Sequence, residues 1–278
     1  WKKRDVLNAS EYALMINEGA INAGIAPKFS DPYSYGQGTN WQDEVFNNNA
    51  PMMNHQVSVS GASEKVNYLF SLGFYTQDGI VGGNFDRSNY ERLTLRSNTQ
   101  YTLFDESKER NWLNSLKVTS NLSYARIKST NFDDNSTWGT PLGSALALSP
   151  ILNVYDETEE AIKAQFDKYG TTAEYTPVYD PRNGKLFSIP GEFGEMSNPI
   201  AKLSLPGDKH WSHKFVANFS AELQLWDNLK FKTSYGADLS FWGYDGYRPL
   251  YYLRSGESST QSSAYSRKED GTVWQLEN

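Results

Sequence analysis

The sequence predicts an all-β fold built from long antiparallel strands. Three observations lead to it: apolar and polar residues alternate with period two, the alternating segments are long, and the connections between them are short and long in turn. Such alternation gives a strand one apolar and one polar face. A hairpin over residues 54–76 is the first example, with Val57, Phe70 and Leu72 on its apolar face.

The alternation predicts six full strands and the start of a seventh. They are expected at about residues 54–61, 65–76, 89–104 and 113–128, at two segments within 212–242, and at 273–278. The longer ones reach ~14–16 residues, against the ~5–6 that are usual in globular sheets. Such lengths argue against an ordinary sandwich.

The connections alternate in length along the chain. Tight turns follow the first, third and fifth strands, whereas residues 77–88, 129–211 and 243–272 form long connections. Short turns at one rim and long loops at the other are typical of an antiparallel transmembrane β-barrel of an outer membrane. Six strands are too few to close so wide a barrel, so the sequence predicts an arc of a larger one.

The barrel interpretation assigns the remaining segments to extracellular loops that contain short helices. Residues 1–53 are expected to form one such loop, with a helix at about residues 10–22, and residues 129–211 and 243–272 form two more. Aromatic residues fall where the two membrane interfaces are expected. They are Phe104, Trp112 and Trp226 near the short turns, and Phe74, Tyr124, Trp211, Phe241 and Trp242 near the long loops.

A secreted, soluble all-β glycan-binding module is the alternative, because a β-sandwich also alternates. The composition is 38% hydrophobic and 14% aromatic, and no apolar run approaches the ~20 residues of a spanning helix. The net charge of −7 gives no reason to expect a nucleic-acid partner, and the chain has no cysteine. It starts at Trp1 without a signal peptide, so we expect a part of a longer polypeptide.

Several blocks of sequence occur in a recognisable order. They are WQDEVF at 41–46, APM at 50–52, VSVSGASEK at 57–65, QDGIV at 77–81, FDRSNY at 85–90, LSPILNVY at 148–155, NPIAKL at 198–203 and WDNLK at 226–230. In this order they resemble the barrel region of the SusC/RagA-type TonB-linked (TonB-dependent) outer-membrane transporters of Bacteroidetes.

The resemblance implies an architecture and a set of partners. The barrel would have 22 strands, an N-terminal plug, a SusD-like surface lipoprotein as a lid, and energy supplied through TonB. Its cargo would be oligosaccharides or, in some members, peptides. The signal peptide, TonB box, plug and last strand of the family pattern have no counterpart in these 278 residues.

Charged residues on the polar faces of the strands are the first candidate functional set. A lipid-facing Arg or Lys costs up to about 2–4 kcal/mol at mid-bilayer, so such residues are expected to face the lumen or the plug. Two roles are expected for these charged residues: they form salt bridges that hold the plug, or they contact the substrate. The first role is favoured. The set is Arg92, Arg96, Glu222, Lys230, Lys232 and Asp238.

Aromatic residues of the expected loops form the second set. They could stack on the flat C–H faces of sugars, or pack against other loops or the lid, and neither reading is preferred. The set is Trp138, Trp242, Tyr244, Tyr247, Tyr251 and Tyr252.

No catalytic residue, metal site or cofactor is expected, and the chain is not expected to be an enzyme. His210 and His213 are three residues apart in a strand, so their side chains should point to opposite faces. Acidic residues at 156–160 are better explained as the solvated first turn of a helix than as a calcium site.

Overall fold

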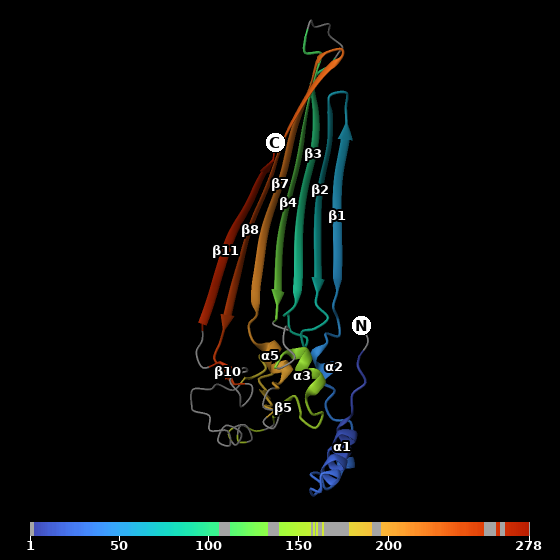
Figure 1. Ribbon diagram of the computed structural model, residues 1–278, viewed down its shortest axis with the longest axis vertical. Coiled ribbons are helices and arrows are strands. Elements are labelled where there is room, and N and C mark those ends of the chain that lie inside the picture. The colour runs from blue at the N-terminus through green and yellow to red at the C-terminus, as the bar shows by residue number, and fades with distance from the viewer. Residues whose placement is uncertain are drawn as a thin grey trace.

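The structure is a computed structural model that describes residues 3–105, 112–132, 139–156, 158, 160, 163, 178–190, 196–252, 260–261 and 265–277. Its main feature is one seven-stranded antiparallel sheet in the order β1-β2-β3-β4-β7-β8-β11 (Figure 1). The order follows the chain, since the two-stranded pairs β5–β6 and β9–β10 lie in the long connections. The sheet is open in this chain.

The strands of the sheet are β1 (Met52–Ala62), β2 (Val66–Asp78), β3 (Asn89–Phe104), β4 (Ser115–Asn131), β7 (Asp208–Trp226), β8 (Leu229–Arg248) and β11 (Tyr265–Glu277). The small strands are β5 (Tyr155–Asp156), β6 (Leu186–Phe187), β9 (Tyr251–Tyr252) and β10 (Thr260–Gln261). Three expected limits are corrected. β7 begins before residue 212, β8 continues past residue 242, and β11 begins before residue 273.

The two ends of the sheet differ, as Figure 1 shows. The strands β1, β3 and β7 end, and β2, β4 and β8 begin, at one end of the sheet, which we call the short-turn end. All labelled helices lie at the other, the long-loop end. This follows from antiparallel pairing of consecutive strands, because every second connection returns to the same rim.

Among the described residues, four short α-helices and one 3₁₀ helix occupy the long-loop end. They are α1 (Ala9–Asn22), η1 (Pro32–Tyr35), α2 (Trp41–Val45), α3 (Pro141–Ala147) and α5 (Pro199–Ser204). Each α-helix begins after a side chain that accepts hydrogen bonds from its first turn: Asn8, Asn40, Thr140 and Asn198. The helix whose first turn is expected at residues 156–160 lies mostly outside the described residues.

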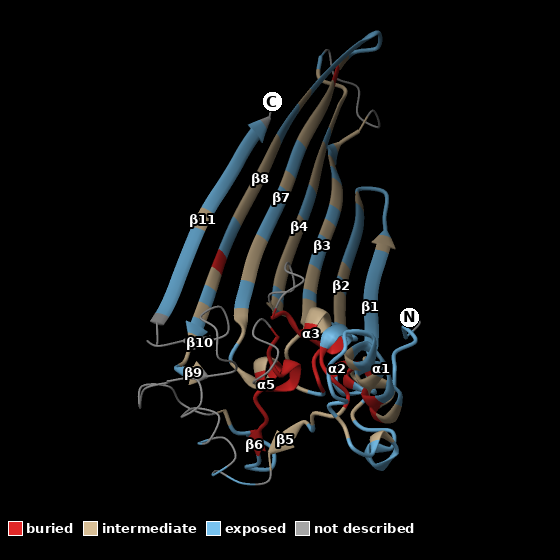
Figure 2. Ribbon diagram, turned by 60° about the horizontal axis from the view of Figure 1, so that its bottom comes forward, coloured by how far each residue is buried: buried red, intermediate tan, exposed pale blue. Residues whose placement is uncertain are grey.

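One hydrophobic core lies among the long loops, and we call it the loop core (Figure 2). Its buried residues are Trp41, Val45, Val81, Ala145, Leu148, Phe187, Met196, Ile200, Ala201 and Leu203. The indole Nε1 of Trp41 donates to the carbonyl of Ser149 at 3.0 Å, across 108 positions of sequence. In the described strands of the sheet, only Gln224 and Gly243 are buried.

Candidate functional site

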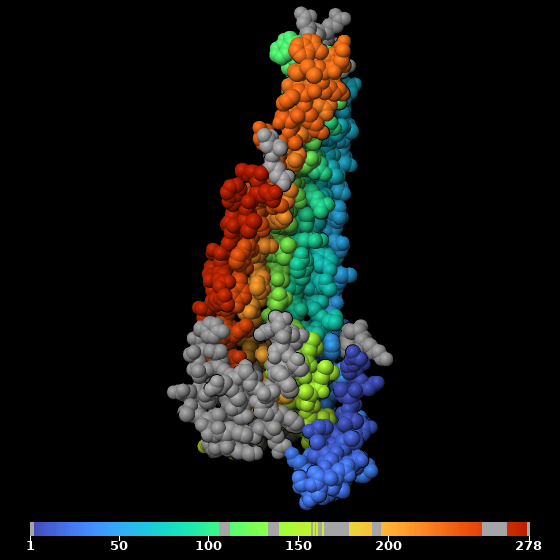
Figure 3. Space-filling model, in the orientation of Figure 1, coloured from blue at the N-terminus to red at the C-terminus, as the bar shows by residue number. Residues whose placement is uncertain are grey.

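The sheet has an apolar face whose side chains are exposed. Residues directly opposite each other on neighbouring strands share a face, and the pairs Val57–Leu72, Leu72–Leu95 and Phe215–Leu239 carry this face across the sheet. Val57 is 66% exposed and Leu276 is 67% exposed. On the face that Figure 3 shows, the strands are uncovered above the loops. The apolar face therefore spans the sheet without a protein layer over it among the described residues.

Two β-bulges at the short-turn end bring aromatic residues onto this face. The register shifts between Thr102 and Phe104, so that Phe104 pairs with Leu116 of the apolar face. A second shift, before Trp226, pairs Trp226 with Leu229. A bulge re-aims the following side chain by inserting one residue. Both aromatic residues thus lie where a rim contact with lipid is expected.

The opposite, polar face contains a small pocket around two of the predicted arginines. Arg92 and Arg96 of β3 line it together, and the guanidinium of Arg92 lies 5.6 Å from the ring centre of Tyr75. Gly73 opens the space between them, since it has no side chain. Asn54, Gln56, Ser71, Phe74 and Thr94 complete the lining, and the volume is about 110 Å³.

This pocket is too small for a whole ligand, because ligand pockets usually measure about 300–1,000 Å³. It can hold one carboxylate or one hydroxyl-bearing group against two guanidinium donors. The residues that sequence reasoning missed here are Asn54, Gln56 and Tyr75. Their positions have the same parity as Arg92 in the sheet register, which is the signal that could have found them.

The other predicted charged residues lie on the polar face of β7 and β8, away from the arginine pocket. Glu222 is directly opposite Lys232 on one side and Lys117 on the other. Asp238 forms an ion pair with Lys214 at 3.0 Å. Lys230 lies opposite Gln224 near the short-turn end. The structure therefore divides the predicted set between a basic pocket on β2–β3 and a mixed-charge ladder on β4–β7–β8.

The predicted aromatic set is not a loop set. Trp242, Tyr244 and Tyr247 belong to β8, which corrects the expectation that they lie in a loop. Trp242 and Tyr244 share parity with Asp238, so Trp242 lies on the polar face and not in a lipid-facing belt. Tyr244 lies 5.0 Å from the ring centre of His210.

The remaining members of that set lie elsewhere. Tyr251 and Tyr252 form β9, and Tyr251 packs against the loop core. Trp138 lies outside the described residues. The structure therefore does not bring the six aromatic residues together as one surface.

A hydrogen-bonded network around the ion pair of Asp180 and Arg182 joins two of the long loops. Arg182 donates three side-chain hydrogen bonds to the Asp180 carboxylate, and the shortest contact is 2.7 Å. The same guanidinium donates to the carbonyl of Gly83 at 3.0 Å and lies 3.9 Å from the ring centre of Phe85. Tyr155 donates its hydroxyl to Asp180 at 2.7 Å. This network fastens the loop after β2 to the loop between β4 and β7.

The network sets the protonation of its members. Burial alone would raise the pKa of Asp180, but the hydrogen bonds from Arg182 and Tyr155 outweigh it and hold that pKa below its usual value. Burial, reinforced by the bond to Asp180, raises the pKa of Tyr155. Burial also raises the pKa of Asp156, whose Oδ2 atom is buried and has no hydrogen-bond partner among the described residues.

Metal-binding groups are not found in the part of the chain that the structure describes. His210 and His213 lie on opposite faces of β7, as their register partners Tyr244 and Phe241 show. Among the described helices, none combines the length and apolar character needed to cross a bilayer. Of the acidic residues at 156–160, those at 157 and 159 lie outside the described residues.

Comparison with known proteins places the chain. No family model matches it. It is 27% identical over 233 residues to the TonB-dependent receptor SusC of Bacteroides thetaiotaomicron, covering 81% of the chain and 20% of that protein. It is 31% identical over 215 residues to the TonB-dependent receptor P26 of Formosa agariphila, covering 77% of the chain and 17% of that protein. The chain thus spans about a fifth of the length of these relatives.

Solved structures with the same fold support the placement. The RagAB peptide transporter matches with a TM-score of 0.55 at 17% identity, over 88% of this chain and 27% of that chain. The RagAB peptide importer in its open-open state matches with a TM-score of 0.51 at 19% identity, over 90% of this chain and 24% of that chain. The chain is therefore SusC/RagA-like: at modest sequence identity it is similar to a segment of TonB-dependent receptors of the outer membrane.

Proposed function

We propose that this chain forms part of the barrel wall of an importer that is driven through TonB and moves cargo by gated passage rather than by bond chemistry. In this role the apolar face contacts lipid and the polar face lines the interior. The observation that carries the proposal is the apolar face itself, which is exposed across seven long strands. The long-loop end is then extracellular and the short-turn end periplasmic.

The soluble glycan-binding alternative agrees poorly with this face. A β-sandwich covers the apolar side of one sheet with a second sheet. Among the described residues, the small strand pairs β5–β6 and β9–β10 accompany the large sheet, and both lie at the long-loop end. A soluble protein rarely exposes more than a few hundred Å² of continuous apolar surface.

The partners and cargo are proposed from the relatives. SusC and RagAB carry names that point to a TonB-dependent receptor and to a peptide transporter, respectively. We therefore expect a SusD-like lipoprotein over the long-loop end and an oligosaccharide or peptide cargo. The arginine pocket is expected to hold an acidic side chain of the plug, because its volume suits one functional group and its two guanidinium groups favour an anion.

Uptake in living cells tests this function. Deletion of the gene that encodes the chain is expected to abolish uptake of either labelled oligosaccharides or labelled peptides, and complementation is expected to restore it. Uptake by the wild type should be stopped by a protonophore, since the proposed importer uses TonB energy. Unchanged uptake of both cargo classes after deletion, or recovery of the intact protein from the soluble fraction, contradicts the proposal.

A paired variant distinguishes the two roles of the arginine pocket. If Arg92 and Arg96 hold the plug, Arg92→Gln with Arg96→Gln should loosen it and increase entry of a large antibiotic such as vancomycin. If they contact cargo, the same variant should reduce uptake without such entry. Lys214→Gln, on the same face but outside the pocket, is the matched control.

A further inference from the structure

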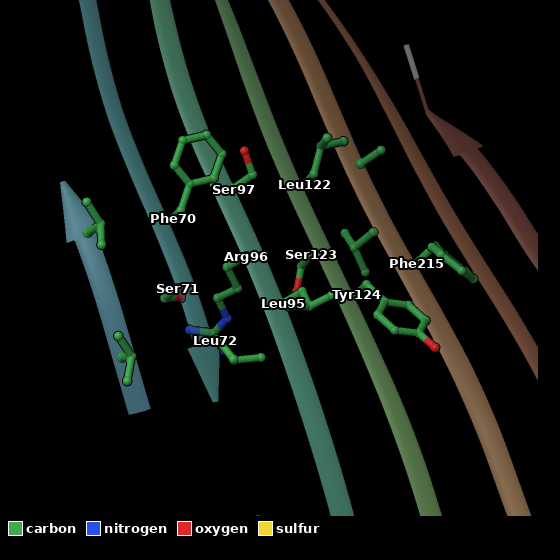
Figure 4. Close-up of a pocket in the computed structure, with 14 residues that line it drawn as sticks. Phe70, Ser71, Leu72, Leu95, Arg96, Ser97, Leu122, Ser123, Tyr124 and Phe215 are labelled. Atoms are coloured by element: carbon green, nitrogen blue, oxygen red, sulfur yellow. The ribbon is translucent and has the colours of Figure 1, made fainter. Parts of the chain in front are cut away.

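The apolar face carries a hollow of about 530 Å³ near the middle of the sheet (Figure 4). Its lining is almost entirely apolar and comes from five neighbouring strands, β1 to β4 and β7. The side chains of the apolar face that line it include Phe70, Leu72, Ser97, Leu122, Tyr124 and Phe215. A hollow of this chemistry on a lipid-facing surface can accept a hydrocarbon chain.

Tyr124 forms the border of the hollow nearest the long-loop end. Its ring lies 4.7 Å from the ring of Phe215, centre to centre, and its hydroxyl is 2.8 Å from Nδ1 of His213. Tyr124 therefore turns its ring to the hollow and its polar atom to the next row of side chains. An amphipathic ring with one apolar and one hydrated end is typical of a membrane interface.

Two basic residues follow on the same face. Arg126 lies between Leu93 and His213 in the sheet register, so no carboxylate is directly opposite it on either neighbouring strand. Lys128 lies one step further, between Glu91 and Trp211. Arg126 and Lys128 share the parity of Leu122 and Tyr124 in β4, which places all four on the apolar face.

Cations at this position need an explanation, because this face meets lipid. An Arg on the lipid face costs about 2–4 kcal/mol at the bilayer midplane but only about 0–1 near the interface. The row that starts at Arg126 therefore marks the interface, where phosphate groups lie. Basic residues at this depth attract anionic headgroups by about 1 kcal/mol each.

We propose that the hollow and the row of Arg126 and Lys128 together form a binding site for one lipid whose headgroup carries anionic phosphate. An acyl chain occupies the hollow, and the phosphate contacts Arg126 and Lys128 beyond the Tyr124–His213 pair. The inference rests on the proposed function, since it requires this face to lie in a bilayer. It adds a specific lipid partner to a surface that otherwise contacts membrane lipid without specificity.

The test measures which lipid stays bound to the full-length protein. Native mass spectrometry after transfer from a 1:1 mixture of dioleoylphosphatidylglycerol and dioleoylphosphatidylcholine is expected to show a preference for the glycerol lipid. Arg126→Gln with Lys128→Gln should reduce that preference by roughly fivefold for each charge removed. Lys117→Gln with Lys214→Gln, which removes two charges from the polar face, should leave it unchanged.

A second variant tests the hollow separately from the charges. Ser97→Phe fills the hollow without a change of charge, and it is expected to reduce the amount of both retained lipids. Inorganic phosphate should not displace the retained lipid, because the acyl chain contributes to binding. Equal retention of the two lipids by the wild type, or a preference that survives Arg126→Gln with Lys128→Gln, overturns the proposal. Either result leaves the barrel function standing if the protein still inserts into bilayers.

Discussion

Asp180 has no exposed side-chain surface, and two residues, Arg182 and Tyr155, donate side-chain hydrogen bonds to its carboxylate. Arg182 is partly exposed, with 39% of its side chain accessible. A buried carboxylate that is paired and hydrogen-bonded in this way stabilises the contact it makes, whereas loss of one partner leaves the other charge unpaired. The pair orients Arg182, whose hydrogen bond to the carbonyl of Gly83 joins two long loops across 99 positions of sequence.

Asp180→Asn is expected to destabilise the long-loop end by about 2 kcal/mol. The figure lies below the ~3–5 kcal/mol of a fully buried pair because solvent screens the exposed part of Arg182. Amide hydrogen exchange in residues 79–88 and 178–190 measures the loss. Asp43→Asn removes the exposed ion pair with Lys3 near α2 and should change exchange by less than about 0.5 kcal/mol. Equal effects from the two changes would show that the Asp180 network does not fasten the loops.

The carboxylate of Asp180 also makes the stability of the long loops depend on pH under acidic conditions. The folded pKa of Asp180 lies below its unfolded value of about 3.9. Its stabilisation is therefore fully present above about pH 4 and is lost as the pH falls through the folded pKa. After correction for intrinsic exchange, amide exchange rates in residues 178–190 should not change between pH 7 and pH 5, because Asp180 stays ionised there. They should rise only at more acidic pH.

Asp156 is expected to behave in the opposite way. Burial raises its folded pKa, so its contribution favours the folded state below the unfolded pKa and is lost as the pH rises through the folded pKa. Asp156→Asn removes a half-buried charge with an unpartnered oxygen and should stabilise the long-loop end by about 1 kcal/mol at pH 7. The gain should vanish at acidic pH. Thermal unfolding of the long-loop end, monitored by its sensitivity to protease, measures the gain. A loss of stability at pH 7 on Asp156→Asn would contradict the raised pKa of Asp156.

At the scale of the strand, the two faces are separated by register alone. Residue pairs such as Asn121–Asn218 and Leu122–Ala217 alternate along the β4–β7 ladder between the polar and the apolar face. A shift of one residue would exchange every side chain between lipid and lumen. The two bulges near the short turns are the exceptions, and they bring Phe104 and Trp226 to the apolar side.

A pair of neighbouring substitutions in β4 tests this separation. Leu122→Arg places a charge on the lipid face and should cost about 2–4 kcal/mol of folding free energy in a bilayer. Asn121→Arg places the same charge on the polar face and should cost little. Folding of the full-length protein into lipid vesicles, followed by gel mobility and denaturant titration, gives both values. Similar costs at the two positions would contradict the assignment of the faces.

Sequence periodicity predicted most of the sheet, because apolar and polar side chains alternate over most of β1 to β4, over β7 and over the first part of β8. It ended β8 too early, since Trp242, Gly243 and Tyr244 interrupt the contrast between the faces. The structure explains the interruption in part: the Gly243 backbone lies against Trp211, so that position has no room for an apolar side chain. Near a rim, a strand extends beyond the bilayer, so its side chains no longer need to alternate between apolar and polar.

The loop core and the candidate site were harder to predict. Trp41 and Ser149 are joined across 108 positions, and Arg182 reaches the carbonyl of Gly83. Such contacts leave no local period in the sequence. For the site, parity alone placed Arg92 and Arg96 on one face, but Tyr75 and the opening at Gly73 depend on the register between β2 and β3.

At the scale of the whole molecule, buried and exposed apolar residues lie in different parts of the structure, the loop core and the sheet. The loop core holds most of the described buried apolar residues, while the sheet exposes its apolar residues. This distribution is the reverse of a soluble β domain, which buries its sheet and exposes its loops. It is the arrangement expected when lipid replaces protein as the solvent of one face.

Depth-resolved quenching tests that central claim most directly. These 278 residues contain no cysteine, so a single fluorophore can be attached in this region at Phe219→Cys or at Ser220→Cys, neighbours on opposite faces of β7. The full-length protein is reconstituted in vesicles with brominated acyl chains, which quench only fluorophores that contact them. The account predicts strong quenching at position 219 and little at position 220; equal quenching at both positions, or quenching at 220 alone, would contradict it.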